Sequence, residues 1–140
     1  MSRKGSSGFT LIEIMLVVVI ISILAAMVVP RLAGRTEEAR RKRAAVDVAN
    51  IENAVGLYEL DTGKYPSQLA DLFHAPGDLP ESSWKGPYLR KRTKPTDPWG
   101  HDYVYRAPGE HNPEDYDLYS LGPDGRAGTD DDITNWGSSL

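Results

Sequence analysis

The sequence predicts an α+β protein in which one long N-terminal helix, apolar in its first half and amphipathic in its second, packs against a small antiparallel sheet. Three observations predict this arrangement. An apolar run from residue 9 leads into a stripe of apolar residues at helical spacing, two β-rich stretches lie near the C-terminus, and a loop rich in Gly and Asp follows them. A few strands resting on one amphipathic helix make an α+β plan.

Composition limits the classes of function. The 140 residues amount to one domain's length, and the formal net charge of −4 argues against a nucleic-acid partner, which usually requires a basic face. The chain contains no cysteine, which excludes a disulfide framework, a thiolate metal site and a cysteine nucleophile. A small domain of this kind is stabilised by docking on a long helix, by a metal or by oligomerisation.

The first helical half, residues 9–30, has the length and apolarity of a membrane segment. Residues 14–29 carry no charge, and Glu13 is the one charged residue from 9 to 29. About 20 apolar residues cross a bilayer, and Arg3 and Lys4 predict a cytoplasmic N-terminus. The run is too long for an ordinary secretory signal. A plain signal anchor leaves Glu13 unexplained, because a carboxylate in the membrane costs about 2.5 kcal/mol.

The second half, residues 31–61, is predicted to continue the helix. Residues 31–43 carry charges of both signs, which fits a solvated face or contact with lipid headgroups or neighbouring subunits. An apolar stripe follows at spacings of four, three, four and three, made of Ala44, Val48, Ile51, Val55 and Tyr58. Gly63 is placed to end the helix at about Asp61. The stripe is expected to cover the rest of the chain, the globular region 62–140.

Within residues 62–140 the pattern predicts short elements separated by Pro and Gly. A helical piece is expected at 68–73, with Ser67 as its cap. Two strands are expected at 103–105 and 116–120, and the turn residues 112–115 between them predict a hairpin.

The loop at residues 120–133 is the candidate metal site. It holds four aspartates within nine residues, Asp124, Asp130, Asp131 and Asp132, among glycines that allow tight turns. Calcium takes six to eight oxygen ligands, whereas zinc and copper are poorly served without His or Cys. The spacing is not that of an EF-hand. From spacing alone, a calcium site and a solvated acidic turn are equally open.

The stretch Gly8-Phe9-Thr10-Leu11-Ile12-Glu13, behind a basic leader, resembles the signature of type IV prepilins and pseudopilins. The resemblance implies that a prepilin peptidase removes residues 1–8 by cutting after Gly8 and methylates Phe9. The new amine of Phe9 and the carboxylate of Glu13 are at i,i+4 spacing in one helix, and they also suit a contact between subunits. Glu13 is therefore expected to set the axial stagger during assembly.

Motifs further along the chain resemble the major pseudopilin of type II secretion. They lie at residues 58–66, 95–100, 116–125 and 131–136. The resemblance implies a pilin-like fold and one structural calcium ion. Its expected ligands are the side chains of Asp124, Asp131 and Asp132, the carbonyl of Leu121 and a carbonyl from residues 126–129, for which we name Thr129. The role of Asp130 stays open.

The implied function is structural and not enzymatic: the chain polymerises into a periplasmic pseudopilus that drives export of folded proteins across the outer membrane. The implied partners are further copies of the chain, minor pseudopilins, the inner-membrane assembly platform, prepilin peptidase and, before assembly, membrane lipid. The subunit would sit in the bacterial inner membrane with its C-terminal region in the periplasm. A type IV pilin and a minor pseudopilin are the alternatives. His74, His101 and His111 show no metal-ligand spacing that would favour an enzyme.

Overall fold

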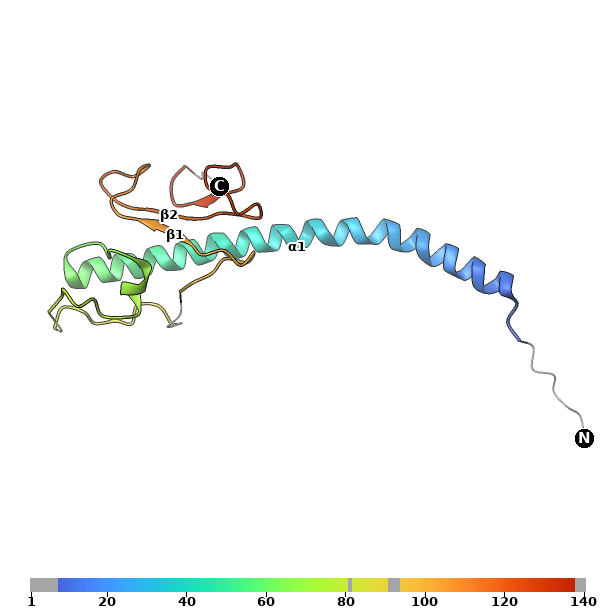
Figure 1. Ribbon diagram of the computed structural model, residues 1–140, viewed down its shortest axis with the longest axis horizontal. Coiled ribbons are helices and arrows are strands. Elements are labelled where there is room, and N and C mark those ends of the chain that lie inside the picture. The colour runs from blue at the N-terminus through green and yellow to red at the C-terminus, as the bar shows by residue number, and fades with distance from the viewer. Residues whose placement is uncertain (1–7, 81, 91–93, 138–140) are drawn as a thin grey trace, which may run out of the picture. The chain divides into compact units, whose positions relative to one another are not determined.

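The computed structural model describes residues 8–80, 82–90 and 94–137, without the side chains of residues 28–33. Its elements follow in the order α1 (Leu11–Thr62), η1 (Leu69–Leu72), β1 (Val104–Arg106), β2 (Asp117–Ser120) and β3 (Ile133–Thr134) (Figure 1). The chain forms two compact units, Met1–Glu38 and Ala39–Leu140, which are described separately. Most of the predicted leader, residues 1–7, lies outside the described part.

The first unit contains the start of α1. Its large apolar side chains are exposed, from 47% for Val17 to 79% for Phe9 and Leu11. Within the described residues, none of the helices combines the length and the apolarity needed to span a bilayer. The predicted membrane segment, residues 9–30, includes three residues whose side chains lie outside that description.

In the second unit, the predicted apolar stripe of α1 is buried. Ala44, Val48, Ile51, Val55 and Tyr58 are each at most 4% exposed. The helix ends at Thr62, one residue after the predicted end. Gly63 follows with φ of 75°, a conformation that favours glycine, and its N–H donates to the carbonyl of Glu59. The stripe is therefore the helix's contribution to the core, as predicted.

The sheet has three antiparallel strands in the order β1-β2-β3. The predicted hairpin is confirmed: β1 pairs with β2, and Tyr105 faces Leu118 across the pair. The third strand, β3, was not predicted; it adds to the other edge of β2. Leu118, on the central strand, is fully buried and belongs to the same core cluster as Val55 and Tyr58 of α1.

The short helix η1 completes the core with Leu69 and Leu72. The predicted cap at Ser67 is wrong, because Gln68 occupies the N-cap position. The side chain of Asp71 closes this end instead, since its carboxylate accepts the N–H groups of Ser67 and Gln68 at 2.9 and 3.2 Å. Exposed N–H groups at a helix start need such acceptors.

Candidate functional site: an acidic loop closed by the sheet

The pairing of β2 with β3 closes the base of the acidic loop. Ser120 faces Ile133 and Tyr119 faces Thr134 in this ladder. Beyond β3, Asn135 extends this closure: its N–H donates to the carbonyl of Leu118, and its Oδ1 accepts the Leu118 N–H, both at 2.9 Å. The two ends of the predicted loop 120–133 are thus held together by the sheet.

Glycine at position 122 lets the two sides of the loop touch. Gly122 has φ of 62°, and a Cβ added there would lie 2.4 Å from the carbonyl oxygen of Asp131 and 2.7 Å from its Oδ2. Such distances leave no room for a side chain. The backbone at Gly122 therefore lies directly against one of the predicted ligands.

A network through Thr129 joins two predicted ligands. The Thr129 hydroxyl lies 2.5 Å from Oδ1 of Asp131 and 3.4 Å from Oδ1 of Asp124. Asp131 also accepts the N–H of Asp124, and Asp124 accepts that of Arg126 at 2.8 Å. The hydrogen bond from Thr129, followed by the one from the Asp124 backbone, lowers the pKa of Asp131 despite partial desolvation. Asp131 is therefore an anion at neutral pH.

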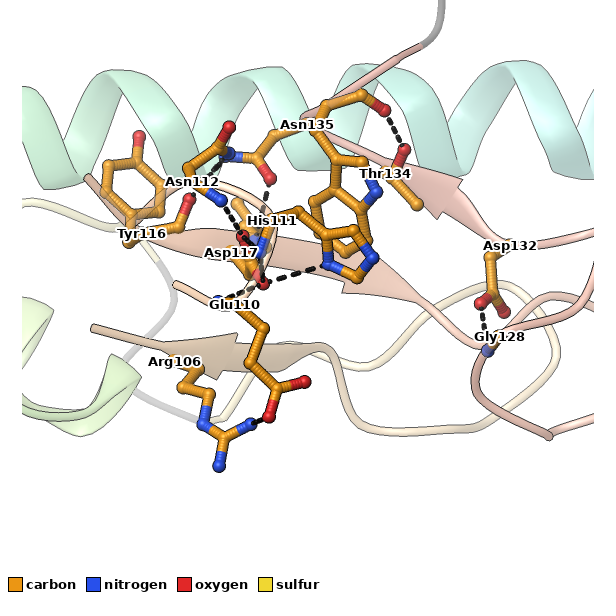
Figure 2. A network of polar contacts seen from close by, with 12 residues as sticks. Arg106, Glu110, His111, Asn112, Tyr116, Asp117, Gly128, Asp132, Thr134 and Asn135 are labelled. Carbon is orange, nitrogen blue, oxygen red and sulfur yellow. Dashed lines mark hydrogen bonds and ion pairs between the residues drawn. The ribbon is translucent and has the colours of Figure 1, made fainter. Parts of the chain in front are cut away.

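Asp132 carries a buried oxygen with no hydrogen-bond partner. Its Oδ2 accepts the N–H of Gly128 at 2.7 Å (Figure 2). Its Oδ1 is buried, and no donor reaches it within the described part of the chain. A buried unpaired carboxylate oxygen is costly, and a cation beside it would satisfy it. This observation fits an oxygen-coordinated ion in the loop.

The structure brings the predicted ligands together only in part. Asp124, Thr129 and Asp131 share one network, Asp132 is bonded to Gly128, and Asp130 is exposed. Across the described residues, no three His, Cys, Asp or Glu side chains gather closely enough to hold a metal ion by themselves. An ion in this loop therefore requires backbone carbonyls as well, which calcium accepts as ligands.

The predicted processing residues lie at the start of α1. Gly8 and Phe9 are exposed and precede the helix. Glu13 and Thr10 form a reciprocal pair: the Glu13 N–H donates to the Thr10 hydroxyl at 3.3 Å, and the Thr10 N–H lies 3.5 Å from Oε2 of Glu13. This is a capping box, and the spacing Thr-x-x-Glu would have predicted it. Thr10 was missed by the sequence analysis.

Asp117 is a second missed residue, and it holds the β1–β2 connection. Its buried carboxylate accepts the N–H groups of Glu110, His111 and Asn112 at 2.8–3.0 Å, and Nδ1 of His111 lies 3.1 Å away (Figure 2). A Cβ at Gly109 would lie 2.4 Å from this carboxylate. Burial raises the pKa of Asp117, but these donors outweigh burial and lower it overall. No local periodicity in the sequence signals such a cluster.

Comparison with known proteins agrees with the resemblance. Residues 31–136 match the family described as type II secretion system (T2SS), protein G, and residues 3–29 match the prokaryotic N-terminal methylation motif. The type II secretion system core protein G of Escherichia coli K12 is 49% identical, over 94% of this chain and 92% of that protein. The protein of the same name from Pseudomonas aeruginosa PAO1 is 47% identical, over 97% of this chain and 99% of that protein.

A solved structure agrees as well. The crystal structure of the major pseudopilin from the type 2 secretion system of enterohaemorrhagic E. coli matches with a TM-score of 0.63 and 35% identity, over 78% of this chain and 94% of that chain. The sequence comparisons and the structural comparison thus agree on one family over most of the chain. The chain belongs to the type II secretion system protein G family and is a pseudopilus subunit.

Proposed function

We propose that the chain is cut after Gly8, methylated at Phe9 and polymerised into a periplasmic pseudopilus that drives export of folded proteins across the outer membrane, without enzymatic activity of its own. The observation that carries this proposal is the coexistence, in one chain, of an N-terminal methylation motif at residues 3–29 and the protein G region at residues 31–136. The methylation motif supports processing of the N-terminus, and the protein G region supports a role in type II secretion.

Before assembly, the subunit resides in the inner membrane with its N-terminus in the cytoplasm. Arg3 and Lys4 ahead of the apolar run support this orientation. The apolar side chains from Phe9 to Met27 are about half to four-fifths exposed within the subunit. An apolar surface of this size requires cover, first from lipid and then from the helices of neighbouring copies. Minor pseudopilins, the assembly platform and prepilin peptidase are the further partners in this proposal.

Glu13 acts in assembly once cleavage has produced an amine on Phe9. Among the described residues, the Glu13 carboxylate accepts one long hydrogen bond, from the Thr10 N–H at 3.5 Å. The Phe9 amine of a neighbouring copy would be a stronger partner, because pairing opposite charges away from water relieves the cost of each.

Pseudopilus formation in cells tests this role. We expect Glu13→Ala to abolish assembly while leaving the amount of processed subunit unchanged. Glu114→Ala, which alters an exposed glutamate of the second compact unit (Ala39–Leu140, the globular unit), is the control and should assemble normally. Normal fibres from the Glu13 variant would contradict the proposed role.

A calcium ion in the acidic loop stabilises the globular unit in this proposal. The side chains of Asp124, Asp131 and Asp132 and the carbonyls of Leu121 and Thr129 would hold it. Support comes from the unpaired buried oxygen of Asp132, from the ionised Asp131 and from the closure of the loop by β2 and β3. An ion that binds only the ordered loop adds its binding free energy to folding.

Thermal unfolding of the full chain in detergent tests the calcium site. All three tryptophans lie in the globular unit, so their fluorescence reports on that unit. At a calcium concentration of 100 times Kd, the ion adds about 2.7 kcal/mol of stability. We expect the melting temperature to rise with calcium in the wild type and in the control Asp78→Asn, but not in Asp124→Ala. Equal melting temperatures in calcium and in chelator would contradict the site and leave the assembly proposal to the Glu13 experiment.

A further inference from the structure

The turn at residues 95–102 is built around a buried carboxylate. The side chain of Asp97 is fully buried. Its Oδ1 accepts the N–H groups of Trp99 and His101 at 3.0 and 2.8 Å. A backbone hydrogen bond closes the same turn: the Asp97 N–H donates to the His101 carbonyl at 2.8 Å. Asp97 is thereby held rigidly by its own turn.

The second oxygen of Asp97 reaches the start of the acidic loop. Oδ2 of Asp97 accepts the hydroxyl of Ser120, which is fully buried, at 2.6 Å. The oxygen of the same hydroxyl accepts the N–H of Gly122 at 3.1 Å. Asp97, Ser120 and Gly122 form a hydrogen-bonded relay from the turn into the loop. At 2.6 Å, the bond between Ser120 and Asp97 is short for a hydrogen bond from a hydroxyl to an oxygen acceptor, and it lies in the buried interior.

The relay determines how one predicted ligand points. The N–H of Gly122 and the carbonyl of Leu121 belong to the same peptide group, which is planar and, when trans, directs these two groups oppositely. Binding the Gly122 N–H to Ser120 therefore sets the direction of the Leu121 carbonyl. The same Gly122 backbone lies against Asp131, since a Cβ there would fall 2.4 Å from the Asp131 carbonyl oxygen. Two of the predicted ligands thus depend on the position of Gly122.

We infer that Asp97 and Ser120 are positioning residues for the calcium loop: they orient the Leu121 carbonyl and the Gly122 backbone without touching the ion. This inference rests on the calcium site of the proposed function. His101 of the same turn lies against the loop at Gly125. A Cβ added to Gly125 would lie only 2.9 Å from Nε2 of His101. Second-sphere groups of this kind typically change metal affinity by about 10- to 100-fold.

Asp71 provides a matched control for a purely structural role. It is also a buried carboxylate, with 6% of the whole residue exposed against 5% of the whole Asp97 residue, and it also accepts two backbone N–H groups. It lies on η1 and its carboxylate bonds to Ser67 and Gln68, not to the acidic loop. Asp71→Asn should therefore lower the melting temperature while leaving calcium affinity unchanged.

The experiment compares Asp97→Asn, Ser120→Ala and Asp71→Asn in the full chain in detergent. Calcium titration gives the Kd of each, and amide hydrogen exchange in chelator gives the protection of Gly122 relative to the core amide of Leu118. We expect calcium affinity to fall about 10- to 100-fold in the Asp97 and Ser120 variants and not in the Asp71 variant. Exchange at Gly122 should accelerate selectively in the same two.

The outcomes separate the relay from the calcium site. If Asp97→Asn and Ser120→Ala show the same calcium affinity and the same Gly122 exchange as the Asp71 control, the inference is overturned, even if the wild type binds calcium. A wild type that does not respond to calcium would overturn the proposed metal site, and the exchange comparison in chelator would then decide the relay alone. If Asp97→Asn does not fold, Ser120→Ala decides, because it removes one hydroxyl and keeps the bonds from the Trp99 and His101 N–H groups to Oδ1 of Asp97.

Discussion

Replacing Asp132 with asparagine should change stability in opposite directions with and without calcium. Oδ2 of Asp132 accepts the Gly128 N–H at 2.7 Å, whereas Oδ1 is buried and has no hydrogen-bond partner among the described residues. Asp132→Asn keeps the shape and an acceptor for Gly128, and removes one negative charge from a loop that also contains Asp130 and Asp131. The substitution is therefore harmful only if a cation normally uses this carboxylate.

The structure sets the size of both effects. Without calcium, the wild type bears the cost of an unpaired buried oxygen, about 1–3 kcal/mol, and the variant relieves part of it. With calcium at 100 times the wild-type Kd, the ion adds about 2.7 kcal/mol to the wild type, but only about 0.4 kcal/mol to a variant that binds a hundredfold more weakly. The variant should then be less stable by roughly 2 kcal/mol before the relieved cost is counted.

The assay is thermal unfolding of the full chain in detergent, followed by tryptophan fluorescence. One kcal/mol corresponds to roughly 4–8 °C for a domain of 60–100 residues. Before the relieved cost is subtracted, roughly 2 kcal/mol corresponds to about 8–16 °C, so we expect the variant to melt below the wild type by up to that amount in calcium, and at or above it in chelator. A variant that melts below the wild type by the same margin in both conditions would refute the reasoning, because Asp132 would then serve the fold alone.

Two further predictions concern the core and the β1–β2 connection. Leu118→Ala should lower the free energy of unfolding by about 2–5 kcal/mol, since Leu118 is fully buried, while Leu60→Ala, at 82% exposure, should stay within about 0.5 kcal/mol of the wild type. Similar urea midpoints for the two would contradict the packing of β2 on α1. The lowered pKa of Asp117 stabilises the fold above its unfolded pKa of about 3.9, and this contribution is lost as the pH falls through the folded pKa. The stability difference between the wild type and Asp117→Asn, measured in urea, should therefore shrink below about pH 4, and a difference that does not change with pH would count against the ionised cluster.

The helix and hairpin were predictable because their signals are local. Spacings of three and four residues identified the stripe from Ala44 to Tyr58, and each member is buried. Turn residues between two β-rich stretches identified the hairpin, and β1 and β2 pair as expected. Successive members of the stripe are only three or four residues apart, and the two strands follow each other directly in the chain. Local periodicity therefore carries the information.

Two features were missed, for different reasons: the partner of β3 is distant in the chain, whereas the cap of η1 is local. The strand β3 has only two residues, Ile133 and Thr134, too few to show alternation, and it forms because β2 offers a free edge. At η1, the carboxylate of Asp71 from within the helix took the role expected of Ser67. For β3 the deciding partner, β2, lies elsewhere in the chain, and no local pattern contains it. At η1 the deciding residue lies only three to four positions away, and Ser67 was expected because serine is a common N-cap residue.

The acidic loop was only partly predictable from the sequence. Its aspartates and glycines were visible in the sequence, but the sequence alone could not separate a cation site from a solvated turn. The structure adds two features that a solvated turn does not require: a carboxylate oxygen of Asp132 shielded from water without a donor, and a buried relay from Asp97 through Ser120 to Gly122. The relay joins residues 23 positions apart. Ser120 and Gly122 are buried, and their polar groups need partners in any case, so the relay by itself fits both a structural role and a cation site. The calcium affinities of Asp97→Asn and Ser120→Ala decide between the two, because only a loop that presents the Leu121 carbonyl to an ion loses affinity when the relay is broken.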